Sequence, residues 1–90
     1  MIYEIETIAG LPADRRRSVP LESERRNVQV GTLVRLLVFV NGEHYIAPFV
    51  EVVEILGTEY VGLVGGYINS PDWHPYGTRV HFGPDNIISL

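Results

Sequence analysis

Turn signals divide the second half of the chain into short segments, and they constrain the fold more than any other feature. Within residues 28–90 these signals are Asn41-Gly42, Gly57-Thr58, Gly65-Gly66 and residues 83–86. Asn-Gly between two apolar runs predicts a hairpin, because both residues tolerate a positive φ. The intervening segments are short and rich in valine, leucine and isoleucine, which favours strands. We therefore expect a series of short strands, which at such spacing form a small barrel or a sandwich.

The strands are expected at residues 2–8, 33–40, 49–56, 59–64, 78–82 and 87–90. In the first of these, alternation favours Tyr3 and Ile5 as the buried pair. Pro48 cannot donate to a ladder, so it is expected at an edge or before regular pairing begins. The change of parity between Glu51 and Glu54 predicts a bulge or a strong bend.

Residues 13–27 are polar and rich in arginine. Within them, Pro20 followed by acids and then Arg25 and Arg26 is typical of a short helix with a proline in its first turn. The alternative is an ordered loop. Residues 83–86 predict a tight turn or a 3₁₀ turn before the last strand, as in small SH3-like barrels. The expected fold is mainly β: a small SH3-like barrel of about five strands with an N-terminal strand and a short helix.

Ninety residues allow a single domain, 1–90, in which residues 1–27 hold the N-terminal strand and the arginine-rich segment and residues 28–90 form the barrel core. The chain has no cysteine and no apolar run long enough to cross a bilayer, so we expect a cytoplasmic protein without a membrane partner. Its net charge of −4 and pI near 5.2 argue against a whole-domain nucleic-acid binder.

Five sequence pieces occur in a recognisable order. They are VGTLVRLLVF at 30–39, FVEVVEI at 49–55, YVGLV at 60–64, NSP at 69–71 and GTRVHFGPDNI at 77–87. This order resembles a family of small bacterial domains of unknown function with the pattern VGDxVKLxF, WVEV, YxGxL, NxP and GDxVxFxPxHI. The chain departs from that pattern at Phe49 (tryptophan in the family), at Asn86 (histidine) and at the inserted Gly65-Gly66. The resemblance implies the SH3-like fold and no particular activity.

No motif for catalysis or for a cofactor is present, so we expect neither an enzyme nor a bound cofactor. His44, His74 and His81 lack the spacing of a metal site, and no cysteine can assist them. Ser70, Asp72 and His74 lie in one tight loop, which cannot readily supply an oriented base and an oxyanion hole.

The loop at residues 67–76 combines aromatic and polar side chains, and it is the predicted partner-binding site. Its candidate residues are Tyr67, Asn69, Asp72, Trp73, His74 and Tyr76. Aromatic residues with polar tips are enriched at protein interfaces. The alternative is that Trp73 folds back to plug the end of the barrel, since a small domain needs every large aromatic in its core.

The arginine cluster is the second candidate surface, as an electrostatic contact. Its members are Arg15, Arg16, Arg17, Arg25 and Arg26. The alternative is a solvated segment, because Asp14, Glu22 and Glu24 are interleaved with the arginines.

The resulting functional hypothesis is a non-enzymatic protein-interaction module, such as an inhibitor, an immunity-type protein or an accessory protein. The alternative is a nucleic-acid-associated small barrel that uses the arginine-rich segment. Self-association through the strand at residues 2–8 stays open.

Overall fold

The computed structural model describes residues 3–65 and 79–90. In chain order its elements are β1 (Tyr3–Ile5), η1 (Ile8–Gly10), α1 (Ala13–Arg16), α2 (Glu22–Arg25), β2 (Leu33–Leu36), β3 (Val38–Val40), β4 (His44–Ile46), β5 (Phe49–Leu56), β6 (Glu59–Gly65), β7 (Arg79–Phe82), η2 (Pro84–Asn86) and β8 (Ile87–Ser89), where η marks a 3₁₀ turn.

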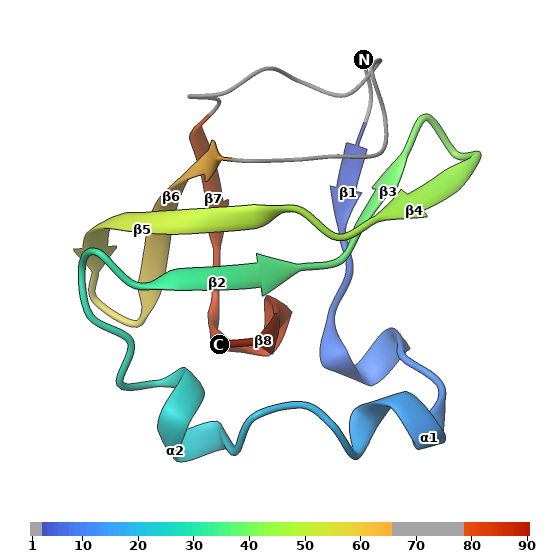
Figure 1. Cartoon of the computed structure of the whole chain (residues 1–90), viewed down its shortest axis with the longest axis horizontal. Coiled ribbons are helices and arrows are strands. Elements are labelled where there is room, and N and C mark those ends of the chain that lie inside the picture. Colours follow the sequence, from blue (N-terminus) through green and yellow to red (C-terminus); the bar gives the residue numbers. More distant parts are fainter. Residues whose placement is uncertain (1–2, 66–78) are drawn as a thin grey trace.

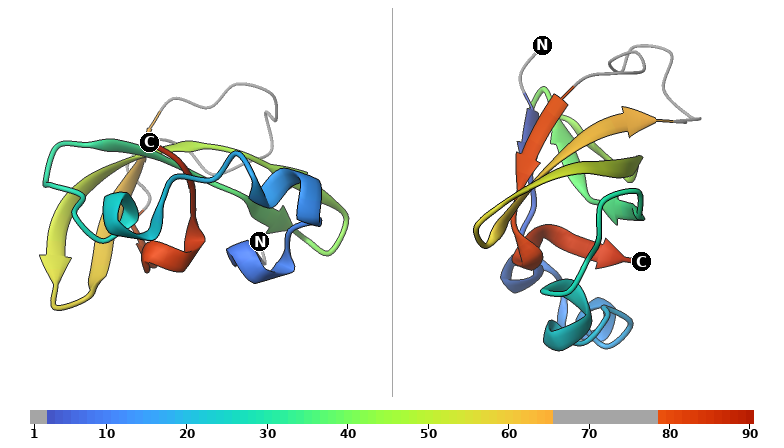
Figure 2. Two further views of the ribbon diagram at one scale, coloured as in Figure 1. Left: turned by 90° about the horizontal axis from the view of Figure 1, so that it is seen from below. Right: turned by 90° about the vertical axis from the view of Figure 1, so that its left-hand side faces the viewer.

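The strands within residues 3–65 and 79–90 form two antiparallel sheets. One has the order β7-β6-β5-β2-β8 and the other the order β1-β3-β4. The five-stranded sheet curls into a half-barrel, and the three-stranded sheet continues from the end of β2 (Figures 1 and 2). The expected mainly β fold, with an N-terminal strand and a short helix, is confirmed.

The core lies on the concave side of the five-stranded sheet. Alternate residues point inward, so that β5 buries Val50 and Val52 completely while Glu51 between them is exposed. In β7 the inward residues are Val80 and Phe82, as the alternation predicted. The buried cluster consists of Val28, Val34, Leu36, Val38, Ile46, Val50, Val52, Tyr60, Val64, Val80, Phe82 and Ile87. It is built mostly from β-branched side chains, which suit a curled pleated surface.

Local turn chemistry is confirmed at several positions. Asn41 and Gly42 have φ values of 52° and 68° and join β3 to β4, as an Asn-Gly hairpin requires. The pairing of β5 with β6 shifts register between Val52 and Glu54, which is the expected bulge. Pro48 is buried just before β5, and its carbonyl accepts a hydrogen bond from the Leu36 N–H at 3.3 Å.

The apolar run 33–40 does not form one continuous strand, contrary to the expectation. It divides at Leu37 into β2 and β3, which pair in different sheets. The pairing of β2 with β5 ends at Arg35 and Phe49, next to Pro48, which has no N–H to extend the ladder. The Leu37 carbonyl instead accepts the Glu6 N–H at 2.8 Å. The first strand is likewise shorter than expected, because Ile8 begins η1.

The N-terminal segment, residues 3–27, contains two one-turn α-helices where the sequence predicted one. The expected helix is present as α2, but it begins at Glu22 rather than at Pro20, and the Glu24 carboxylate accepts the Leu21 N–H at 3.1 Å. Both helices lie along the same side of the molecule, beside β8 (Figure 1). No helix among residues 3–65 and 79–90 is long and apolar enough to cross a membrane.

Candidate functional site

The five arginines of the N-terminal segment fall into two groups. Arg25 is largely buried, with 12% of its side chain exposed, and its guanidinium donates to the carbonyls of Pro20 and Pro84 at 3.0 and 2.9 Å. It also contacts the Asp85 carboxylate at 3.2 Å. Arg26 pairs with Glu22 at 3.1 Å, one helical turn earlier. These two guanidinium groups therefore have partners within the fold.

Arg15, Arg16 and Arg17 differ from this pair. All three side chains are exposed, and none has a hydrogen-bond or ion-pair partner in the part of the chain that the structure describes. They lie on α1 and on the residue that follows it. Within the arginine-rich segment 13–27, the positive charge that can act on a partner is therefore concentrated on these three arginines.

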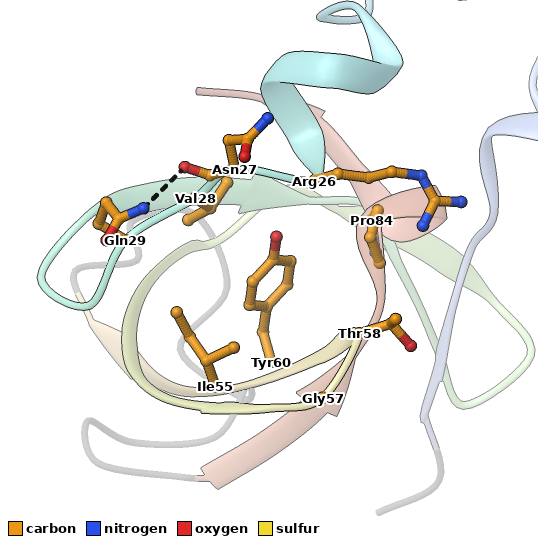
Figure 3. Close-up of a pocket in the computed structure, with 9 residues that line it drawn as sticks. All are labelled: Arg26, Asn27, Val28, Gln29, Ile55, Gly57, Thr58, Tyr60 and Pro84. Atoms are coloured by element: carbon orange, nitrogen blue, oxygen red, sulfur yellow. Dashed lines mark hydrogen bonds between the residues drawn. The ribbon is translucent and has the colours of Figure 1, made fainter.

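A pocket of about 290 Å³ lies at the seam between the N-terminal segment and the half-barrel (Figure 3). It lies between residues 26–29, the β5–β6 turn and η2. The Tyr60 side chain rises through it toward the N-terminal segment and donates its hydroxyl hydrogen to the Arg25 carbonyl at 2.7 Å. The Gln29 amide donates to the Asn27 carbonyl at 3.3 Å. The chain itself satisfies these polar groups. We therefore interpret the pocket as the place where the N-terminal segment packs against the half-barrel.

The predicted aromatic site lies outside the described residues. This applies to all six of its members: Tyr67, Asn69, Asp72, Trp73, His74 and Tyr76. The points where this segment joins the sheet are nevertheless defined, since β6 ends at Gly65 and β7 begins at Arg79. Gly65 is paired with Phe49, and Arg79 is paired with Leu63. The segment therefore leaves and rejoins the sheet beside Phe49 and Leu63.

Those two residues belong to an exposed face on the convex side of the five-stranded sheet. We call it the Arg35–Phe49 face, and it comprises Leu33, Arg35, Phe49, Glu51, Leu63 and Arg79. Leu33, Glu51, Leu63 and Arg79 form one cross-strand row, and Arg35 and Phe49 form the next. Side chains paired across strands share a face of the sheet.

Arg35 and Phe49 form the ordered centre of this face. The Arg35 guanidinium carbon lies 4.4 Å from the centroid of the Phe49 ring, within cation–π range. The Arg35 Nε donates to the Ala47 carbonyl at 3.1 Å, which fixes the side chain. Its two Nη groups have no partner among the described residues and remain available as donors. Phe49 is 39% exposed and Leu33 57% exposed, so apolar surface and fixed donors lie together.

Sequence reasoning did not single out this face. Arg35 is the only charged residue in the run 33–40, and Phe49 stands where the resembling family has tryptophan. Both signals were visible, but their proximity depends on the β2–β5 register, which pairs Arg35 with Phe49. An arginine at an outward position of an otherwise apolar strand is the feature that could have identified the face.

The described histidines and acids do not assemble into a metal site. Among the residues that the structure describes, no three His, Asp or Glu side chains come together to hold an ion. His81 is exposed on β7, on the side opposite to the core. Comparison of the chain with family models, with curated proteins and with solved structures found no match. The resemblance to the family of small bacterial domains therefore stays a prediction.

Proposed function

We propose that this chain is a non-enzymatic protein-interaction module that binds a partner through the Arg35–Phe49 face together with the aromatic residues of the adjoining segment 67–76. One observation carries the proposal: Phe49 is exposed at the start of β5, which is hydrogen-bonded on both sides, and the Arg35 guanidinium lies over its ring. Aromatic residues and arginine dominate binding hot spots, and rigid presentation limits the entropy lost on binding.

The composition of the face supports the same function. Leu33 and Leu63 flank Glu51 in one cross-strand row, with Arg79 at its end. Apolar area beside a few charged groups is the usual composition of a transient interface. The six predicted partner-binding residues belong to the stretch of sequence between Gly65 and Arg79, which end β6 and begin β7.

Fold analogy gives further support. The 3₁₀ turn η2 precedes β8, and β8 pairs with β2, the first strand of the meander. This arrangement resembles that of small SH3-like barrels, many of which bind peptides, although a fold alone does not assign a function. The absence of cysteine fits a reducing compartment, and the proposal places the module in the cytoplasm of a bacterium.

The test is affinity capture from a lysate of the source organism, with and without nuclease, using the wild type and single variants. We expect one dominant nuclease-resistant protein with the wild type. Phe49→Ala, Arg35→Gln and Trp73→Ala should each weaken its binding at least fivefold, which corresponds to about 1 kcal/mol. Tyr45→Ala is the matched control, because Tyr45 is 52% exposed on β4, in the other sheet.

Two outcomes would overturn the proposal. If Phe49→Ala and Arg35→Gln bind as well as the Tyr45→Ala control, the face is not the binding surface. If nuclease removes all captured material, binding is mediated by nucleic acid, and the arginine-rich segment becomes the site.

A further inference from the structure

A second pocket lies nearer the beginning of the N-terminal segment, between α1 and β8. It has a volume of about 310 Å³, and we call it the Arg15 pocket. Its lining residues are Leu11, Arg15, Ser18, Val19, Leu37 and Ile88. Three stretches of chain that are distant in sequence build it, so its shape depends on the tertiary fold.

The floor of the pocket is aliphatic and recessed. Leu11 is only 7% exposed, and Val19, Leu37 and Ile88 are half-buried. Small-molecule pockets in proteins span about 300–1,000 Å³, so this pocket is at the lower end of that range. Such a volume suits one aliphatic side chain better than a whole cofactor.

The rim of the pocket carries polar groups with unused capacity. The Arg15 guanidinium has no partner in the described part of the chain, and Arg16 and Arg17 beside it are also exposed and unpaired. The Ser18 hydroxyl donates to the Arg15 carbonyl at 3.0 Å, so its lone pairs remain as acceptors. Asp14 is the acid of this helix and is itself exposed. An incoming group would therefore meet net positive charge and an acceptor beside an apolar floor.

We propose that the Arg15 pocket binds an acidic peptide segment of a partner protein that carries an aliphatic side chain. The aliphatic side chain would occupy the recess formed by Leu11, Leu37 and Ile88. A carboxylate next to it in sequence would accept hydrogen bonds from Arg15, as planar guanidinium groups favour. A backbone N–H of the peptide could donate to the Ser18 hydroxyl.

Two other occupants fit this geometry less well. Single-stranded nucleic acid is usually held by aromatic stacking platforms, and among the residues that the structure describes no aromatic side chain lines this pocket. A membrane surface is usually engaged by apolar side chains that protrude, whereas Leu11 is recessed. The proposal is independent of the Arg35–Phe49 face, which shares no residue with the pocket.

The experiment is a nuclear magnetic resonance titration of the isotope-labelled full chain with blocked tripeptides. The probe is Glu-Leu-Glu, and the two controls are Gln-Leu-Gln, which lacks the charge, and Glu-Ser-Glu, which lacks the aliphatic group. We expect Glu-Leu-Glu to perturb the amides of Ser18, Val19, Leu37 and Ile88, with millimolar affinity and a response that weakens in high salt. Each control should bind at least twofold more weakly.

Two variants then test whether Arg15 is the residue that binds the carboxylates of the peptide. Arg15→Gln should weaken Glu-Leu-Glu binding about two- to fivefold, the effect of one exposed ion pair, and should leave Gln-Leu-Gln binding unchanged. Arg26→Gln is the matched control, because Arg26 belongs to the same segment and already pairs with Glu22. Its affinity for Glu-Leu-Glu should equal that of the wild type.

Several results would overturn the inference. These are no binding of Glu-Leu-Glu at several millimolar, equal binding of all three tripeptides, perturbations confined to other residues, or an Arg15→Gln variant that binds normally. Tighter binding of a dodecathymidine oligonucleotide, or of vesicles containing phosphatidylserine, through Arg16 and Arg17 would assign the arginines to nucleic acid or to membrane instead. None of these results would affect the capture experiment on Phe49 variants, so the two proposals can fail separately.

Discussion

Tyr60 provides a sharp test of how the N-terminal segment is fastened to the half-barrel. Tyr60 is 3% exposed, and its hydroxyl donates to the carbonyl of Arg25, 35 residues earlier in the chain. Arg25 is the last residue of α2, and the last carbonyls of a helix have no partner within the helix. The Tyr60 hydroxyl therefore satisfies a helix-end carbonyl from another element.

The perturbation is Tyr60→Phe, which removes only the hydroxyl group. The ring, whose centroid lies 5.6 Å from that of Phe82, should keep its packing. The loss leaves the Arg25 carbonyl unpaired at a partly buried position, which costs about 1–3 kcal/mol. Domains of this length have a free energy of unfolding of about 5–13 kcal/mol, so the loss is substantial. The melting temperature should fall by about 4–8 °C for each kcal/mol.

Urea unfolding followed by circular dichroism measures this loss. We expect a lower midpoint with an unchanged m-value, because the surface exposed on unfolding is nearly the same. Tyr45→Phe is the control: its hydroxyl also donates to a distant residue, the Glu6 carboxylate at 3.3 Å, but Tyr45 is exposed. Its removal should cost less than about 0.5 kcal/mol. Equal effects of the two substitutions would refute the reasoning.

A double-mutant cycle with Arg25→Met extends the test. The Arg25 side chain donates to the carbonyls of Pro20 and Pro84. Like Tyr60, it therefore holds the N-terminal segment against the half-barrel. If the two residues act on one structural unit, their effects on the free energy of unfolding should be non-additive by about 0.5–3 kcal/mol. Additive effects would mean that they stabilise independent regions.

Two further predictions concern packing and ionisation. Gly62→Ala should lower the free energy of unfolding by about 1–3 kcal/mol in the same urea assay, because a β-carbon there would overlap Val50 and press on Phe82; a neutral effect would show that β5 and β6 can separate without cost. Desolvation and the Glu6 carboxylate raise the pKa of Tyr45 above its ordinary value of 10.0. Its contribution to stability is therefore present below pH 10 and is lost as pH rises through the raised pKa. Ultraviolet titration should show the pKa of Tyr45 falling in Glu6→Gln, and an unchanged pKa would exclude this contact.

The parts of the fold that depend on local backbone chemistry were predictable from the sequence. Asn41-Gly42 fixed the hairpin through positive φ values, and the parity change between Glu51 and Glu54 gave the bulge. Residues 83–86 gave the 3₁₀ turn before the last strand. In each case the residues that carry the signal are close in sequence to the element that they determine.

The features that the sequence did not predict depend on distant partners. The division of the run 33–40 at Leu37 requires Glu6, whose N–H bonds to the Leu37 carbonyl. The one-turn helix α1 has no buried residue, so its pattern lacks an apolar stripe. Arg25 belongs to a polar segment whose composition indicates exposure to solvent. Its guanidinium nevertheless donates to the carbonyl of Pro84, which is distant in sequence. Cross-chain register likewise determines that Arg35 meets Phe49.

These distant contacts make residues 3–27 part of the same folded unit as the β-meander. Asn86 of η2 donates to the Glu6 carbonyl at 3.1 Å, and Arg25 donates to the Pro84 carbonyl in the same turn. Removing the segment would therefore leave hydrogen-bonding groups of η2 and Tyr60 without partners. The lost free energy would be a large fraction of the free energy of unfolding of a domain of this size. The strand β8 follows η2 and pairs with β2, and β2 carries Arg35, which is paired with Phe49. The contacts of residues 3–27 with η2 therefore also help to position β2 and the Arg35–Phe49 face. The arginine-rich segment thus has a structural role through Arg25, and its exposed arginines remain available for binding.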